Sequence, residues 1–275
     1  DPLWSRGLGD VYKRQVHHGR KFGIEYTLIE HNPLERGVVY IPGLNSGRDS
    51  EECTILKKYF ENHNTGPGNF LCYDPRGLGK SDLSYQDCGP STWIEDAYNM
   101  ITMMHEITRK PPLVVGNSMG AHFASCIAQR QMCEIHSLVL ICPAINYAAI
   151  FHEFVKSILT KQQLKEFEDG KVVIVDVGNH ENWEPFSYSL KQYEDSIANK
   201  IVTSEGPIEG NFPVRVIHGM NDQTVPFKWT LSLELDQMFK SDDLQLTLVK
   251  NCDHVVMNNQ LGFDTVRKTI ETLLV

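Results

Sequence analysis

The sequence predicts an α/β fold built on a doubly wound, mostly parallel sheet. Short apolar runs alternate with longer amphipathic runs, which is the pattern of βαβ units. The middle apolar runs, such as Leu138–Ile141, are continuous and β-branched, which is typical of strands buried on both faces. A length of 275 residues is enough for one large hydrophobic core with an insert.

The expected elements alternate along most of the chain. Strands are predicted at Ile24–Glu30, Gly37–Ile41, Asn69–Tyr73, Leu113–Gly116, Ser137–Cys142, Val214–His218 and Leu244–Val249. Helices are predicted at Glu51–Asn62, Ser91–Thr108, Gly120–Gln131, Pro226–Lys240 and Gly262–Leu274. Ser50 can cap the first helix, and Glu51 and Glu52 suit the positive end of its dipole.

One long segment, residues 144–212, interrupts this alternation. It is rich in charged and aromatic residues, with helical stretches at Phe151–Phe167 and Ser187–Ile201 around the apolar run Val172–Val177. A connection of this length is too long for a simple loop. We therefore expect a helical cap inserted at about 144–212; ordinary helices added to one edge of the sheet are the alternative.

The first fifteen residues show neither a strand nor a helix period. They resemble translated adapter sequence, so we expect 1–15 to be a non-native segment and 16–275 to form a single domain. A natural disordered tail is the alternative. Because the first methionine is Met100, we also expect the native start and any targeting segment to be missing.

Composition excludes several classes of protein. Lys and Arg number 26 against 35 Asp and Glu, a net charge of −9 that argues against nucleic-acid binding. No apolar run approaches the roughly 18 residues of a transmembrane helix, so we expect a soluble protein. The seven cysteines form no CxxC pair, which argues against a zinc or redox site and favours a reducing, intracellular compartment, cytoplasmic or mitochondrial. The oligomeric state stays open.

A nucleophile motif, G-x-S-x-G, spans Gly116–Gly120. A serine that attacks a carbonyl must project above the sheet, so the chain turns sharply from strand to helix and strains the serine backbone. Gly116 and Gly120 let the strand and the helix approach closely. The pattern predicts Ser118 as the nucleophile; a glycine-rich turn with a bystander serine is the alternative.

A serine nucleophile needs a base, and the base needs an orienting carboxylate. Asp222 lies just past the predicted strand Val214–His218, and His254 lies in the loop after the next strand. The chain order Ser118, Asp222, His254 is the one that this motif requires. These residues are the predicted catalytic triad.

Several other residues compete for these roles. Asp253 is adjacent to His254, and adjacent side chains diverge. Asp242 and Asp243 lie at a helix–strand turn, where we expect them to be solvated. His218 is expected to have a polar role at a strand end, with contact to the site as the alternative. His122 is expected to be structural or to line the pocket.

An acyl-transfer site also needs two backbone N–H donors for the oxyanion. One normally belongs to the residue after the nucleophile, here Met119. The strand Gly37–Ile41 runs into a Pro-Gly turn in which Gly43 permits close approach, so Leu44 N–H is the predicted second donor. An ordinary turn is the alternative.

Taken in order, these motifs resemble the α/β-hydrolase superfamily from about Ile24 to Leu274. The turn Asp74–Ser81 is similar to a D-x-R-G-x-G-x-S turn of that superfamily, where it implies a structural role. Three patches also resemble the mitochondrial acyl-protein thioesterase and acyl-glucuronide esterase branch: Gly37–Gly43, Gly116–Gly120 and Ile217–Asp222. That resemblance implies the same triad. Asn117 and Met119 depart from the small residues usual beside that branch's serine.

The sequence therefore predicts a serine hydrolase that cleaves an ester or thioester of a small-molecule acyl substrate through an acyl-enzyme. Neither a metal nor a cofactor is required. Aromatic residues of the cap are expected to line an apolar acyl pocket. The alternatives are a non-catalytic ligand-binding protein with this fold, a serine aminopeptidase, and a C–C bond hydrolase.

Overall fold

The computed structural model describes residues 14–32, 34–62, 67–177, 185–201 and 206–275. Its main sheet has eight strands: β1 (Gln15–Lys21), β2 (Ile24–Glu30), β3 (Gly37–Ile41), β4 (Asn69–Tyr73), β5 (Leu113–Asn117), β6 (Ser137–Ile141), β10 (Val214–Gly219) and β12 (Leu244–Val249). Their order in the sheet is β1-β2-β4-β3-β5-β6-β10-β12. Only the two pairs that involve β2 are antiparallel. The predicted mostly parallel sheet is confirmed.

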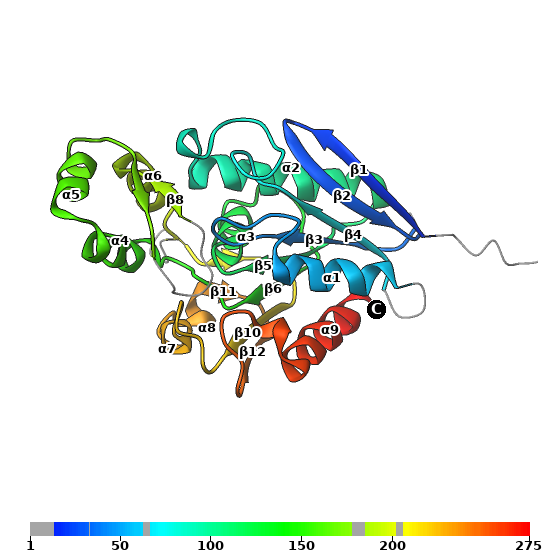
Figure 1. Cartoon of the computed structure of the whole chain (residues 1–275). Coiled ribbons are helices and arrows are strands. Elements are labelled where there is room, and N and C mark those ends of the chain that lie inside the picture. Colours follow the sequence, from blue (N-terminus) through cyan, green and yellow to red (C-terminus); the bar gives the residue numbers. More distant parts are fainter. Residues whose placement is uncertain (1–13, 33, 63–66, 178–184, 202–205) are drawn as a thin grey trace, which may run out of the picture.

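Helices cover both faces of this sheet (Figure 1). One face packs against α2 (Pro90–Thr108) and α3 (Met119–Gln129), and the other against α1 (Glu51–Glu61) and α9 (Gln260–Leu274). Every residue of β3, β4, β5 and β6 is buried, because helices lie above and below them. Ser50 accepts a hydrogen bond from Cys53 N–H and caps α1, as predicted.

The antiparallel edge strand β1 was not predicted. It pairs with β2 through a two-residue turn in which Phe22 and Gly23 both have positive φ angles, 58° and 77°. Its sequence, QVHHGRK, is mostly exposed and polar, so it lacks the apolar run that marks the central strands. Gln15, the last residue of the segment expected to lie outside the fold, is its first residue; 1–13 lie outside the described residues.

The single helix predicted at Pro226–Lys240 is wrong. The structure has two short helices and a strand there: α7 (Phe227–Leu231), α8 (Leu235–Met238) and β11 (Phe239–Lys240), which pairs with β9 (Ile208–Glu209). Glu234 adopts a left-handed conformation, φ 48°, which ends any continuous helix. The apolar periodicity of the segment hides this break.

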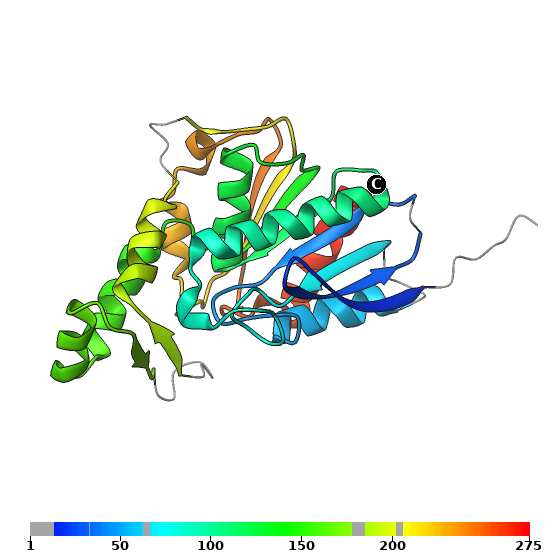
Figure 2. The ribbon, with the colours of Figure 1, turned by 90° about the horizontal axis from the view of Figure 1, so that it is seen from above.

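The segment between β6 and β10 contains α4 (Ala148–Ile158), α5 (Lys161–Glu168), β7 (Val173–Val175), β8 (Phe186–Tyr188) and α6 (Leu190–Ala198). Leu159 is extended and Thr160 caps α5, so the predicted helix at Phe151–Phe167 is split in two. These elements bury a small core of their own, which includes Phe167 and Tyr188. They lie together at one end of the molecule (Figures 1 and 2). The parts of the segment at 178–184 and 202–205 lie outside the described residues.

All seven cysteines are free, and most are buried. Within the described ranges, no helix combines the length and the apolar composition needed to cross a membrane.

Candidate active site

The register of the sheet brings the ends of the central strands to one edge. Ile41 pairs with Gly116, and Asn117 pairs with Ile141. Ile141 in turn pairs with Ile217, and β12 ends in register with β10. The loops that follow these strands are therefore neighbours, and they carry Leu44, Ser118, Asp222 and His254.

Ser118 occupies a strained turn between β5 and α3. Its φ of 52° and ψ of −116° lie in a region that residues other than glycine rarely adopt. A Cβ on Gly116 would lie 2.6 Å from the Gly120 carbonyl oxygen, and a Cβ on Gly120 would lie 2.2 Å from the Ile41 carbonyl oxygen. The two glycines are therefore needed for strand, helix and neighbouring loop to pack this closely.

The loop after β3 packs directly against Ser118. A Cβ on Gly43 would lie 3.1 Å from the Ser118 Cβ, so Leu44 is held beside the elbow. Met119 is the first residue of α3, and N–H groups of a first helical turn have no acceptor within the helix. The helix dipole also places partial positive charge there. Leu44 and Met119, the two predicted oxyanion donors, therefore both lie beside Ser118.

Asp222 and His254 are in direct contact. His254 Nδ1 lies 2.7 Å from Asp222 Oδ2. Asp222 Oδ1 accepts the backbone N–H groups of Thr224 at 2.9 Å and Val225 at 2.8 Å. Burial disfavours charge on Asp222, but the hydrogen bonds from His218 and His254 outweigh it and hold the pKa of Asp222 well below its ordinary value. The carboxylate is therefore ionised at neutral pH.

His218 is a second donor to the same carboxylate. Its Nε2 lies 3.1 Å from Asp222 Oδ2 and 2.8 Å from the Val225 carbonyl oxygen, and its Nδ1 lies 2.8 Å from Thr230 Oγ1. Because both neighbours of Nε2 are acceptors, Nε2 carries the proton and Nδ1 accepts from the threonine hydroxyl. The sequence favoured a polar strand-end role, with contact to the site as the alternative. No pattern in the sequence signals this contact, because it depends on how the chain after β10 turns back.

The Asp222 and His254 loops are fixed to each other by their backbones. Asn221 N–H donates to the Cys252 carbonyl at 2.8 Å. A Cβ on Gly219 would lie 2.3 Å from the Asp253 carbonyl oxygen, so the end of β10 packs tightly under the His254 loop. This contact sets the distance between the Asp222 carboxylate and the His254 imidazole.

Ser118 and the Asp222–His254 pair flank one short turn after β6. Ala144 N–H donates to the Ser118 carbonyl at 3.0 Å, while the Cys142 thiol lies within 4.8 Å of the Asp222 and His254 side-chain atoms. Burial raises the pKa of the Cys142 thiol well above its ordinary value, so the thiol is neutral.

The competing residues are engaged elsewhere. Asp253 Oδ1 accepts the Val255 N–H at 3.0 Å, and Asp243 pairs with Arg215 at 2.8 Å. His122 is buried in α3, and this burial lowers its pKa to about 4, so it is neutral and structural.

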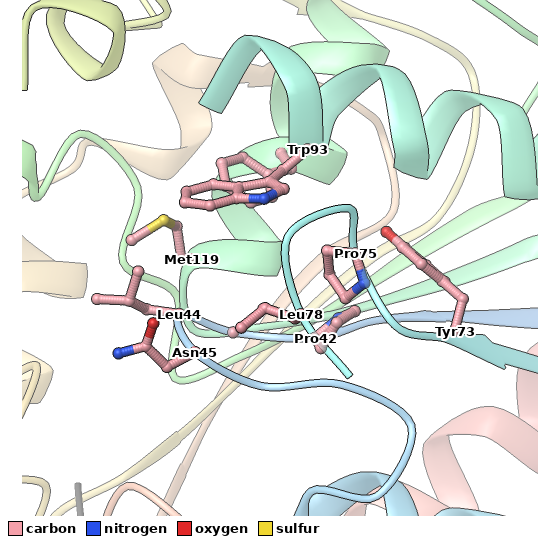
Figure 3. A pocket seen from close by; sticks show the side chains of 10 residues that line it. Pro42, Leu44, Asn45, Tyr73, Pro75, Leu78, Trp93 and Met119 are labelled. Carbon is pink, nitrogen blue, oxygen red and sulfur yellow. The ribbon is translucent and has the colours of Figure 1, made fainter. Parts of the chain in front are cut away.

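A small pocket adjoins both predicted oxyanion donors (Figure 3). Its lining comes from the loops after β3 and β4 and from α2 and α3: Pro42, Gly43, Leu44, Asn45, Tyr73, Pro75, Leu78, Trp93, Met119 and Phe123. None of the described aromatic residues of 144–212 lines this pocket, and some of them pack on one another, as Phe151 does on Phe186 and Tyr188. Trp183, also expected to contribute, lies outside the described residues.

Comparison with known proteins places the chain in a family. The model for a family described as serine aminopeptidase, S33, matches residues 50–260. Palmitoyl-protein thioesterase ABHD10, mitochondrial, from Rattus norvegicus is 26% identical over 220 residues, which is 79% of this chain and 68% of that protein. The Bos taurus protein of the same name is 25% identical over 242 residues, 86% of this chain and 72% of that protein.

Solved structures share the fold. A putative hydrolase from Agrobacterium vitis S4 matches with a TM-score of 0.74 and 21% identity, covering 95% of this chain and 99% of that one. Mouse α/β hydrolase domain-containing protein 10 matches with a TM-score of 0.72 and 22% identity, covering 94% of this chain and 98% of that one. Ferulic acid-bound Est1E from Butyrivibrio proteoclasticus matches with a TM-score of 0.65 and 15% identity, covering 93% of this chain and 96% of that one.

The sheet order, the helical layers and these neighbours confirm the α/β-hydrolase fold, and the relatives confirm the resemblance to the mitochondrial thioesterase branch. The matched range 50–260 includes Ser118, Asp222 and His254. The chain is a hydrolase of the α/β-hydrolase fold and belongs to the serine aminopeptidase S33 family.

Proposed function

We propose that this protein is a serine hydrolase that cleaves carboxylic ester or thioester bonds through an acyl-enzyme. The 2.7 Å contact between buried, ionised Asp222 and His254, on the sheet edge that carries the strained Ser118, is the observation that supports this most strongly. In this proposal Ser118 Oγ attacks the acyl carbon and gives its proton to His254 Nε2.

Each neighbouring group then has a role in this reaction. Asp222 accepts a hydrogen bond from His254 Nδ1–H, so Nε2 is the nitrogen that acts as the base, and the carboxylate stabilises the imidazolium that forms. Leu44 and Met119 N–H groups stabilise the oxyanion. His254 next protonates the leaving alcohol or thiol, and later activates the water that releases the acid.

The pocket favours an ester or thioester over a peptide with a free amino terminus. An aminopeptidase needs a carboxylate placed for the substrate amine. Among the described residues that line the pocket, none is acidic. The relatives named as thioesterases support the same assignment.

The segment 144–212 is proposed to cap this site. Tyr147 donates its hydroxyl to the Thr224 carbonyl at 3.1 Å, and Trp229 Nε1 donates to the Ile145 carbonyl at 2.9 Å, so the segment begins against the Asp222 loop. We also propose an intracellular location, cytoplasmic or mitochondrial, since the relatives' names describe mitochondrial proteins.

Replacing Ser118 tests the nucleophile. Ser118→Ala should lower kcat for p-nitrophenyl acetate by roughly 10⁴-fold or more, because the attacking oxygen is lost. Ser157→Ala, an exposed serine on α4, is the matched control and should leave kcat unchanged. Retained hydrolysis in Ser118→Ala would exclude the proposal.

A further inference from the structure

We infer that the pocket in Figure 3 binds the acyl group and limits the enzyme to short acyl chains, with Trp93 as its end wall. This inference rests on the proposed function, since it assigns one side of the same site. It names the substrate class: esters or thioesters of the shortest acyl groups, acetyl above all.

The position of the general acid decides which side of the substrate enters the pocket. His254 must reach the leaving oxygen or sulfur to protonate it, so the leaving group lies on the side of the loops after β10 and β12. Among the described residues, the pocket lining comes from the opposite side, from the β3 and β4 loops and from α2 and α3. The acyl chain is therefore the part that faces the pocket.

The pocket is small. The centre of a water-sized sphere can move through only about 10 Å³ of it, which is room for about one water molecule. The methyl group of an acetyl ester is of this size. A long acyl chain would need the walls to move.

The walls are held in place. Trp93 is 6% exposed, and its Nε1 donates to the Arg76 carbonyl at 3.0 Å. Its ring lies 5.5 Å from that of Tyr85 and 6.1 Å from that of Phe123. In Figure 3 the indole lies across the group of lining side chains from Leu78.

The Arg76 anchor of Trp93 is itself fixed. Arg76 N–H donates to Asp96 Oδ2 at 2.7 Å, and its guanidinium also pairs with the fully buried Asp96 carboxylate. Moving the indole would disturb this ion pair as well as the aromatic contacts. The wall therefore sets the chain length rather than adapting to it.

The test compares p-nitrophenyl acetate, butyrate and octanoate. The wild-type kcat/KM for octanoate should be at least tenfold below that for acetate. Leu78→Ala shortens a half-buried wall residue, and should raise the octanoate-to-acetate ratio about tenfold. Leu83→Ala, an exposed leucine on the same connection and outside the pocket, is the matched control and should leave the ratio unchanged.

Trp93→Ala should raise the octanoate-to-acetate ratio further. If Trp93→Ala does not fold, Leu78→Ala still tests the inference. A wild-type preference for octanoate, or equal ratios in the Leu78→Ala and Leu83→Ala variants, would overturn this inference while leaving the proposed function intact. Hydrolysis of no ester by the wild type, or full activity in Ser118→Ala, would overturn the proposed function itself.

Discussion

His218 offers the sharpest test of how the acid is positioned. Its Nε2 donates to Asp222 Oδ2 at 3.1 Å from a fully buried ring. The amide nitrogen of glutamine reaches about as far as Nε2, whereas that of asparagine reaches only as far as Nδ1. His218→Asn should therefore lose the bond to Asp222, and His218→Gln should keep it.

The magnitude follows from the charge on the acceptor. A hydrogen bond to a charged group contributes about 1.5–3 kcal/mol. If the transition state depends on the orientation and charge of Asp222, kcat of His218→Asn should fall roughly 10- to 100-fold, with KM little changed. His218→Gln should retain most of kcat.

The pH dependence of stability gives a second readout. Because the pKa of Asp222 is below its ordinary value of 3.8, its ionised form stabilises the fold above that value, and this stabilisation is lost as the pH falls through the lower folded-state pKa. His218→Asn raises the pKa of Asp222 towards its ordinary value of 3.8, so the free energy of unfolding should fall less between pH 7 and 3 than in wild type. Urea unfolding between pH 3 and 7 measures the free energy of unfolding of both proteins.

The assay is hydrolysis of p-nitrophenyl acetate by variants that unfold cooperatively in urea. The expected order of kcat is wild type, then His218→Gln, then His218→Asn. Equal kcat values in wild type and His218→Asn would refute the positioning role. Equal losses of kcat in His218→Asn and His218→Gln would show that the lost hydrogen bond to Asp222 is not the cause of the lower activity.

Two further variants test the elbow and its helix. Gly120→Ala would place a Cβ 2.2 Å from the Ile41 carbonyl oxygen, so the loop that carries Leu44 must shift, and kcat should fall roughly a hundredfold; full activity would contradict this packing. His122 has a pKa of about 4, below its ordinary value of 6.5, so its neutral form stabilises the fold above pH 6.5 and this is lost as the pH falls towards 4. Between pH 7.5 and 5, the free energy of unfolding of His122→Gln should therefore fall by about 2 kcal/mol less than that of wild type. Urea unfolding measures both, and equal losses in the two proteins would contradict this role of His122.

The central strands were predictable because each is an apolar run buried on both faces. The bounds of β2, β3, β4 and β12 agree with the prediction, and those of β5, β6 and β10 differ by one residue. β1 was missed because an exposed edge strand has no such run. The break at Glu234 was missed because it depends on one left-handed residue inside an apolar pattern.

The site was predictable where chain order and chemistry suffice. The order of Ser118, Asp222 and His254 predicted that the last two meet, and they do. The role of His218 was underestimated, since its partner depends on how the chain after β10 turns back. The lining of the pocket beside Leu44 and Met119 was not predicted: residues such as Trp93 and Phe123 line it from different helices, and only the packed fold brings them together.

The central claim is that Ser118 is the nucleophile. Incubation with a small fluorophosphonate, followed by digestion and mass spectrometry, tests it most directly. The account predicts one adduct per chain, located on Ser118, and none in Ser118→Ala. An adduct on another residue, or an unlabelled protein that still hydrolyses esters, would contradict it.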